Sequence, residues 1–165
     1  MPAIDCIKND FAEAIINHCK ERGCKLKLVN LDNYVILKGE KVCEKNCIAC
    51  QICDCLLFVV DTDVLIGLVE LKSKNADARE IEEKLTNGLE IASSILEKCC
   101  IEHEYTNFDF YLIVLAKSWP HAIEHRKIKN TRVMFKGKKY DILPQKCGLS
   151  FLDLISRIRK CPTNT

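Results

Sequence analysis

CDCLLFVVDTDVLIGLVELK, which spans residues 53–72, is almost wholly apolar and is interrupted in its middle by Asp61-Thr62-Asp63, a sequence typical of a turn. The pattern predicts two adjacent strands, residues 53–60 and Val64–Lys72, that pair antiparallel about this turn. Since both strands are apolar on both faces, we expect them in the interior of a sheet, with helices on each side.

Three charged side chains, those of Asp54, Glu70 and Lys72, stand at the open end of this predicted pair. Side chains alternate between the faces of a strand, so Glu70 and Lys72 share a face. Antiparallel pairing about Thr62 brings Asp54 opposite Glu70. Charges on the rim of an apolar sheet cost several kcal/mol unless they are paired or bound to metal, which marks this end as a candidate site.

The residue types at this end predict metal-assisted hydrolysis of a phosphodiester. Asp54 and Glu70 offer the hard carboxylate oxygens that Mg²⁺ prefers, and Mn²⁺ is the alternative ion. We expect the backbone carbonyl of Leu71 to face the same ion. Lys72 can orient or deprotonate a water, or neutralise charge that builds up on a phosphate.

Helices and further strands are expected around the central pair. An amphipathic pattern predicts a helix over residues 5–22, and a capping box of Asp77 and Glu80 begins a second helix over 77–99. Phe108–Ala116 is a third strand that is apolar on both faces. The other expected elements are a hairpin of residues 24–31 and Tyr34–Lys38, a polar cysteine-containing loop over 39–51, a short helix beginning at Pro120, a hairpin of 131–136 and 139–143, and a helix over 150–159.

The order of these elements predicts the fold class. Strands and helices alternate irregularly, which indicates an α/β fold, or more narrowly an α+β fold with a mixed central sheet. At 165 residues the chain has the length of a single domain, and no linker or repeat divides it.

Asp54, Glu70 and Lys72, on a hairpin followed by a capped helix, resemble the PD-(D/E)xK, or restriction-endonuclease-like, nuclease superfamily. This superfamily includes archaeal and viral nucleases and Holliday-junction resolvases. The resemblance covers roughly residues 5–116 and implies a core of a helix, a three-stranded antiparallel run, a helix and a further strand. It also implies that Asp54 and Glu70 bind the divalent metal and that Lys72 is catalytic. Cys53 stands where the superfamily often has proline.

Two further residues are candidates by the same resemblance. Many members add a glutamate from the first helix, and Glu13 is the candidate here, although Asp10 and Glu13 also fit a capping box. Some members place a lysine on the helix that follows the hairpin. Lys84 can fill that role, and a solvated lysine is the alternative.

Charge is unevenly distributed along the chain. Residues 1–116 hold 13 of the 25 Lys and Arg and 20 of the 23 Asp and Glu, so the remaining 12 basic residues of the segment 117–165 face three acidic ones. A basic segment suggests a polyanion partner, and internal charge balance is the alternative. We expect duplex or branched DNA, held through its phosphates. The expected contacts are Arg126, Lys127, Lys129, Arg132, Lys136, Lys138 and Lys139.

Twelve cysteines are many for an intracellular chain. Cys43-x3-Cys47-x2-Cys50-x2-Cys53, in the cysteine-rich loop over residues 39–53, has the spacing of a four-thiolate site for Zn²⁺ or an iron–sulfur cluster. Disulfides such as Cys43/Cys50 or Cys19/Cys24 are the competing interpretation, and buried free thiols are the third. Alternation along the strand turns Cys53 and Cys55 away from Asp54, so we expect a structural role.

Two functions are consistent with these patterns. The first is a metal-dependent DNA endonuclease of repair, recombination or viral genome processing, in which a homodimer is conceivable. The alternative is a non-catalytic, cysteine-rich nucleic-acid-binding or protein-interaction module on the same fold. With no long apolar span and no signal-peptide pattern, we expect an intracellular (cytoplasmic) protein without a membrane partner, and the abundance of Lys, Glu and Ile suits a thermophile.

Overall fold

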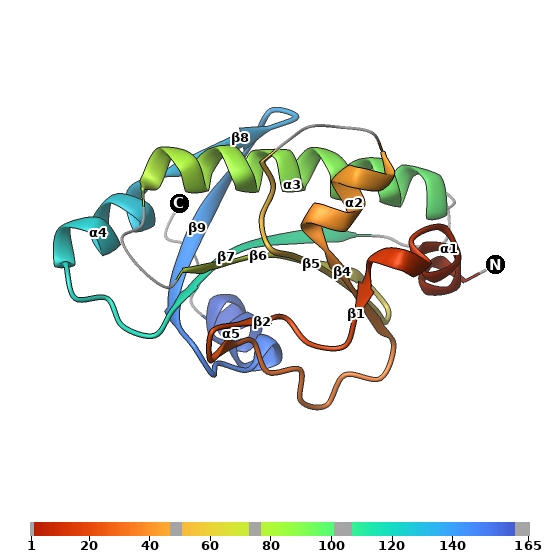
Figure 1. The fold of residues 1–165 in the computed structure, drawn as a ribbon, viewed down its shortest axis with the longest axis horizontal. Coiled ribbons are helices and arrows are strands. Elements are labelled where there is room, and N and C mark those ends of the chain that lie inside the picture. Colours follow the sequence, from red (N-terminus) through yellow and green to blue (C-terminus); the bar gives the residue numbers. More distant parts are fainter. Residues whose placement is uncertain (1, 47–50, 73–76, 101–106, 161–165) are drawn as a thin grey trace.

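A seven-stranded mixed β-sheet runs through the centre of the protein (Figure 1). The computed structural model describes residues 2–46, 51–72, 77–100 and 107–160. In spatial order the strands are β1 (Ile15–Ile16), β4 (Tyr34–Lys38), β5 (Cys55–Val60), β6 (Val64–Lys72), β7 (Phe108–Ala116), β9 (Lys138–Lys146) and β8 (Arg132–Phe135). A separate two-stranded sheet pairs β2 (Lys20–Glu21) with β3 (Cys24–Lys25).

The predicted central hairpin is confirmed. β5 and β6 pair antiparallel from Val60↔Val64 to Cys55↔Val69, so the next step of the register brings Asp54 opposite Glu70. Every residue of β5 is buried. Strands that are apolar on both faces can be covered only in the interior of a sheet, which is where these two lie.

The strands beyond β6 make the sheet mixed and confirm the α+β class. β7 pairs parallel with β6, β9 pairs parallel with β7, and β8 pairs antiparallel with β9. As a result, the carboxyl ends of β4, β6, β7 and β9 and the amino end of β5 lie level with one another along one border of the sheet, the border formed by strand ends. We call this the site edge.

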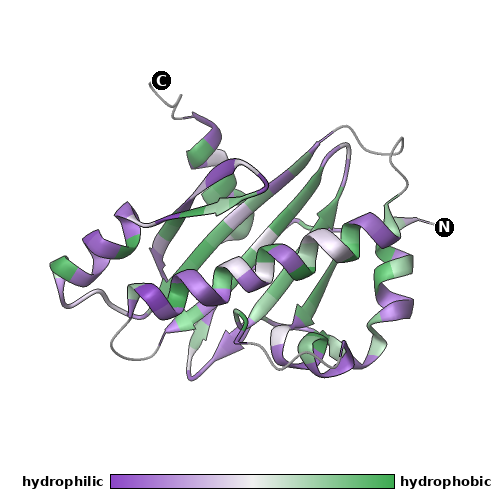
Figure 2. Ribbon diagram, turned by 90° about the horizontal axis from the view of Figure 1, so that it is seen from above, coloured by the Kyte–Doolittle hydropathy of each residue, from purple (hydrophilic) through white to green (hydrophobic). Residues whose placement is uncertain are grey.

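Helices cover both faces of the sheet, with α3 on one side and α5 on the other (Figure 1). Because side chains alternate along the strands, each strand contributes to the hydrophobic cores on both faces of the sheet. Leu56 and Phe58 pack toward α3, and Leu57 and Val59 pack toward α5. Figure 2 shows α3 lying across strands that are mostly hydrophobic. The helices are α1 (Ala3–Asp10), α2 (Gly39–Lys45), α3 (Ala78–Cys99), α4 (Ala122–Asn130) and α5 (Phe151–Lys160), with a short 3₁₀ turn, η1, over Ala12–Ala14.

α3 forms where its pattern predicts it. Its buried residues recur with helical spacing, among them Ile81, Leu85 and Leu89. The Asp77 side chain caps the helix by accepting a hydrogen bond from the Arg79 backbone N–H at 2.9 Å. The predicted reciprocal partner, Glu80, instead pairs with two lysines of the site.

The first forty-five residues differ most from the sequence-based expectation. The helix predicted over residues 5–22 ends at Asp10, because Ile15 and Ile16 pair with β4 as an edge strand. The hairpin of residues 24–31 with Tyr34–Lys38 is also wrong: only β3 forms in the first part, and β4 pairs with β5 and β1. Part of the predicted polar loop, Gly39–Lys45, is the helix α2, which buries Val42 and Cys43.

The C-terminal elements follow the prediction. β8 and β9 form a hairpin whose turn has positive φ at Lys136 and Gly137, as a two-residue hairpin turn requires.

Three disulfides join Cys6 to Cys99, Cys19 to Cys55 and Cys24 to Cys147. Among the described residues, no helix has both the length and the apolar character needed to span a membrane.

Candidate active site

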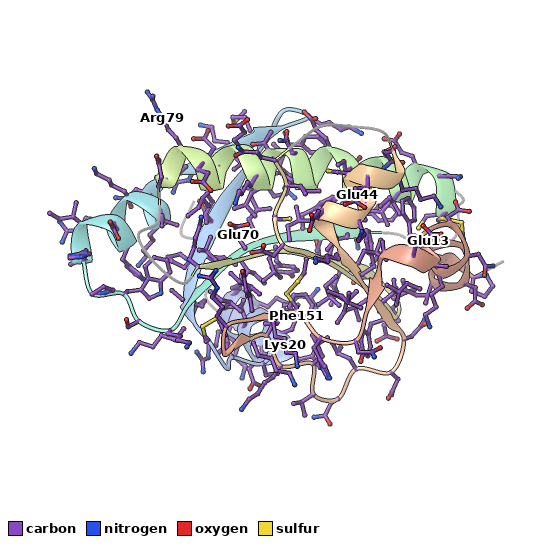
Figure 3. All side chains as sticks on the ribbon, viewed as in Figure 1. Glu13, Lys20, Glu44, Glu70, Arg79 and Phe151 are labelled. Atoms are coloured by element: carbon purple, nitrogen blue, oxygen red, sulfur yellow. A yellow bond between two sulfur atoms is a disulfide. The ribbon has the colours of Figure 1, made fainter. Side chains whose placement is uncertain are left out.

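Glu70 is the centre of a charged cluster at the site edge. It is 2% exposed and stands near the carboxyl end of β6, beneath α3 (Figure 3). Its Oε1 atom lies 3.0 Å from Nζ of Lys84 and 3.3 Å from Nζ of Lys72. Its Oε2 atom is buried and has no hydrogen-bond partner within the described part of the chain. One oxygen of the carboxylate is therefore paired and the other remains to be satisfied.

Glu80 completes the pairing of the two lysines. Its Oε1 atom lies 3.3 Å from Nζ of Lys72 and 3.0 Å from Nζ of Lys84. These contacts hold the pKa of Glu80 below its usual value, the hydrogen bond from Lys84 being the main cause and the charge of Lys72 the next. Burial lowers the pKa of Lys84, but its hydrogen bonds to Glu70 and Glu80 outweigh burial and leave that pKa raised. Lys84 is therefore a firmly charged amine.

Asp54 lies opposite Glu70, immediately before β5. Its Oδ2 atom accepts a hydrogen bond from the backbone N–H of Leu71 at 2.6 Å. Burial, followed by the charge of Glu70, raises the pKa of Asp54 to about 6 despite that hydrogen bond. Because a residue of an antiparallel strand directs its N–H and its C=O toward the same neighbour, the Leu71 carbonyl lies on the Asp54 side of β6.

Asp54 and Glu70 are the residues of the cluster that could hold a divalent cation. Among the described residues, three carboxylates, those of Asp54, Glu70 and Glu80, face two ammonium groups, those of Lys72 and Lys84. A buried oxygen of Glu70 awaits a partner, and hard carboxylate oxygens are the ligands that Mg²⁺ and Mn²⁺ take. Burial and the charge of Glu70 raise the pKa of Asp54, and a cation bound beside it would favour the charged carboxylate.

A cavity of about 550 Å³ gives access to this cluster. Asp54 lines it, and the opening is large enough for a small polar group such as a phosphodiester. The rest of its lining comes from the end of β4, from α2, from the segment before β5 and from α3: Lys38, Glu40, Cys43, Glu44, Gln51, Ile52, Cys53, Glu80 and Lys84.

Lys84 and Glu80 both belong to the charged cluster, although the sequence patterns left Lys84 open as a solvated lysine and assigned Glu80 to a capping box. The side chain of Lys84 is 20% exposed and contacts Glu70 more closely than Lys72 does, so the solvated alternative is wrong. The signal was present, because Glu80 and Lys84 are one helical turn apart at the start of α3 and follow directly on the strand that carries Glu70.

Glu13 is not brought to this cluster. It lies in η1 and lines a separate cavity of about 500 Å³ together with Lys41 and Glu44. Figure 3 shows Glu13 well away from Glu70, with Glu44 between them in that view. The cause is the early end of α1: the chain turns at Phe11, so Glu13 is not carried by a long first helix.

Of the two cysteines that flank Asp54, one lies on the predicted face of the sheet and the other does not. Cys55 lies on the α5 side, as expected, but Cys53 packs on the α3 side, because the chain bends at Asp54 and alternation does not extend across the bend. Cys43 and Cys53 line the same cavity as Asp54. Burial, with the charges of Glu70 and Asp54, keeps the pKa of the Cys53 thiol far above its usual value, so this sulfur is a neutral thiol.

The proposed four-cysteine set is not assembled among the described residues. Cys43 is disulfide-bonded, and a disulfide sulfur does not offer a thiolate to Zn²⁺ or an iron–sulfur cluster. Cys47 and Cys50 lie outside the described residues. The pairing of Cys19 with Cys24 is wrong, since each bonds a more distant cysteine.

The seven predicted DNA contacts separate into two places. Arg126, Lys127 and Lys129 are exposed on α4, which follows β7 at the site edge. Lys136, Lys138 and Lys139 lie at the turn of the β8–β9 hairpin, almost the whole length of β9 away. Arg132 and Lys136 are committed to ion pairs, with Asp141 and Glu97 respectively, each at 2.7 Å.

Compared with known proteins, the chain matches no family model, no curated protein and no solved structure. What it does is therefore inferred from the chemistry of its own residues.

Proposed function

We propose that this protein is a divalent-metal-dependent nuclease of the PD-(D/E)xK type, which hydrolyses phosphodiester bonds of DNA. The observation that carries the proposal is the buried carboxylate of Glu70, whose Oε1 contacts two lysines while Oε2 accepts no hydrogen bond from the described residues. An unsatisfied buried oxygen is costly. A cation bound by Asp54 and Glu70 would remove that cost. The amines of Lys72 and Lys84, which lie next to it, are suited to contact a phosphate.

The order of the elements supports the same proposal. α1, the antiparallel strands β4, β5 and β6, then α3 and β7 follow one another in the order that the resemblance implies for the superfamily core. Asp54 comes just before the second of these strands, and Glu70 and Lys72 end the third. Since one fold hosts many functions, this order supports the proposal only together with the charged cluster.

Asp54, Glu70 and the carbonyl of Leu71 would hold the metal ion. When bound, Mg²⁺ or Mn²⁺ polarises a phosphate and lowers the pKa of a coordinated water. Asp54 must release its proton before it can serve as a ligand, and its pKa of about 6 makes the site competent only above that pH.

Lys72 and Lys84 would stabilise the negative charge that develops on the phosphate oxygens. Both amines contact Glu80 as well as Glu70. The side chain of Glu80 is 43% exposed, whereas that of Glu70 is 2% exposed, so Glu80 is the partner that can move aside when a phosphate arrives. Glu70 keeps both amines near the cluster throughout.

Duplex or branched DNA is the substrate that we propose. Arg126, Lys127 and Lys129 present exposed positive charge on α4, at the edge where the cluster lies. Such residues bind phosphates without reading sequence and orient the strand. Repair, recombination or viral genome processing are the settings in which such an activity is needed.

The disulfides bear on the setting of the protein. Disulfides persist in oxidising compartments and in intracellular proteins of hyperthermophiles. The three disulfides between described residues are compatible with an intracellular protein of a thermophile, which is the setting that we propose. A homodimer is likewise a proposal.

Cleavage of plasmid and branched DNA in Mg²⁺ or Mn²⁺ tests the proposal. Wild type and the control Glu97→Gln, which alters a surface ion pair with Lys136, should cleave equally. Glu70→Gln and Asp54→Asn should cleave roughly a hundredfold more slowly or worse. A wild type without metal-dependent cleavage, or variants that cleave undiminished, would overturn the nuclease and favour the non-catalytic binding module.

A further inference from the structure

A second cavity opens at the site edge, on the far side of β7 from the charged cluster. Its volume is about 700 Å³, which suits a nucleotide-sized ligand. It lies between α4, the end of β9 and α5. The lining residues that give it chemical character are Trp119, His125, Lys146 and Arg157.

Trp119 is held in a fixed orientation at this cavity. Its indole Nε1–H donates a hydrogen bond to the backbone carbonyl of Gln145 at 3.0 Å. Its ring meets His125 edge to face, with the ring centroids 5.2 Å apart. The ring is only partly buried, so it offers a preorganised apolar surface of the kind on which bases stack.

The charge at this cavity is positive. Lys146 and Arg157 are both exposed, and neither forms an ion pair with another described residue. No acidic side chain is among its described lining residues. Arg159, two positions along α5, is by contrast tied to Asp109 at 3.1 Å. The cavity therefore combines an aromatic surface with two available cations, which is the chemistry of nucleotide binding.

The sheet register fixes this cavity relative to the charged cluster. Glu70 pairs with Val114, and Val114 pairs with Pro144, a residue of the cavity wall. Two strand spacings separate Glu70 from Pro144, or roughly 10 Å along the edge. A strand whose phosphate lies at Glu70 can therefore reach the cavity with a neighbouring nucleotide.

We propose that this cavity binds an unpaired nucleotide of the DNA strand that the charged cluster cleaves. The base stacks on Trp119, and Lys146 and Arg157 contact its phosphate. A base within a continuous duplex is stacked between its neighbours and has no face free for Trp119, so the cavity selects junctions, overhangs or frayed ends over continuous duplex. That the strand is a substrate rests on the proposed nuclease function, whereas the binding itself does not.

Intrinsic fluorescence tests the binding directly, because Trp119 is the single tryptophan of the chain. The measurement is made in EDTA, with a blunt duplex, the same duplex carrying a thymidine overhang, and dTMP as probes. The overhang should quench Trp119 saturably, and the blunt duplex should not. Equal quenching by blunt duplex, or by dTMP at the same concentrations, would overturn selection of an unpaired nucleotide within a strand.

Labelled overhang DNA supplies the matched variants. Trp119→Ala should weaken overhang binding roughly 5- to 150-fold. Arg157→Ala, which changes an exposed side chain, should weaken it roughly tenfold, while Arg159→Ala should not. Equal effects of the two arginine variants would contradict the proposal. A protein that binds the overhang in this way but never cleaves would overturn the nuclease alone, and one that cleaves while Trp119 ignores the overhang would overturn this inference alone.

Discussion

Two cavities open at one edge of the sheet, and their charges are opposite. The first is lined by four carboxylates, those of Glu40, Glu44, Asp54 and Glu80, against Lys38 and Lys84. The second has Lys146 and Arg157 and no acidic group among its described lining residues. A phosphate is attracted to the second cavity as it stands, whereas the first repels it until a cation compensates the carboxylates.

The difference teaches what each cavity can do alone. At the first, Lys72 and Lys84 are already engaged by Glu70 and Glu80, so the proposed chemistry would depend on a metal ion and on pH. In the second, the cations and the indole are available, so binding needs neither. Changes that separate these two behaviours test the whole account.

The largest separation is expected from the two site lysines. Lys72→Gln should slow DNA cleavage roughly a hundredfold, because it removes an amine that would stabilise the charge developing on the phosphate oxygens. Lys84→Gln should slow it less, roughly tenfold, since the resemblance to the nuclease superfamily gives the catalytic role to Lys72 and Lys72 is retained in this variant. Single-turnover cleavage measures both. The overhang-dependent quenching of Trp119 should be unchanged in either variant, and a loss of quenching would show that the two cavities are not independent.

The next effect is the dependence of stability on pH. The Asp54 pKa is raised from 3.8 to about 6 by burial and by Glu70, so the folded state binds the proton more tightly than the unfolded state. Without metal, the free energy of unfolding should therefore fall by roughly 2–3 kcal/mol as the pH rises through this interval, and the decrease should be complete above about pH 6.

Urea unfolding in EDTA at a series of pH values measures this contribution. Asp54→Asn should lack it, and Mg²⁺ should stabilise the wild type increasingly as the pH rises through about 6, with the gain levelling off above that pH. If wild type and Asp54→Asn have the same pH dependence, the buried carboxylate does not carry the charge that we assign to it.

The smallest effect concerns the wall of the first cavity. A Cβ at Gly39 would collide with the Cys53 backbone carbonyl, beside the Asp54 carbonyl that the Gly39 N–H contacts at 2.9 Å. Gly39→Ala should lower the free energy of unfolding by roughly 1–3 kcal/mol and reduce metal-dependent cleavage by moving Asp54.

Gly88→Ala, in the interior of α3, is the matched control. A Cβ there meets the ends of side chains, Cys53 Sγ at 2.9 Å and Leu68 Cδ1 at 3.5 Å, which can adjust. A helix interior also gains about 1 kcal/mol from alanine over glycine. Gly88→Ala should therefore be nearly neutral in thermal unfolding, and equal losses in the two variants would contradict this distinction between a backbone collision and a side-chain contact.

Strong local patterning explains which parts of the fold were predictable. β5 and β6 are apolar on both faces about a clear turn, and α3 has a capping aspartate and a buried stripe. The meeting of Asp54 with Glu70 follows from the antiparallel register about the turn at Thr62, so the sequence alone was enough to predict it. β7 was predictable for the same reason as β5 and β6.

Tertiary pairing decided what local patterning could not. Ile15 and Ile16 fit the pattern of an amphipathic helix, but in the structure they pair with β4 as an edge strand. The three disulfides whose two cysteines are both described join residues 36 to 123 positions apart, which spacing cannot reveal. The second cavity gathers Trp119, Lys146 and Arg157 from three separate elements, and the burial of Lys84 depends on how α3 lies over Glu70.

Binding of Mn²⁺, followed by the loss of the electron paramagnetic resonance signal of the free ion, tests the central claim most directly. At a pH above the Asp54 pKa of about 6, the wild type should bind Mn²⁺ in competition with Mg²⁺. Glu70→Gln and Asp54→Asn should lose this binding, while Glu97→Gln retains it. Equal Mn²⁺ binding by all four proteins, or none by the wild type, would contradict a metal site at Asp54 and Glu70.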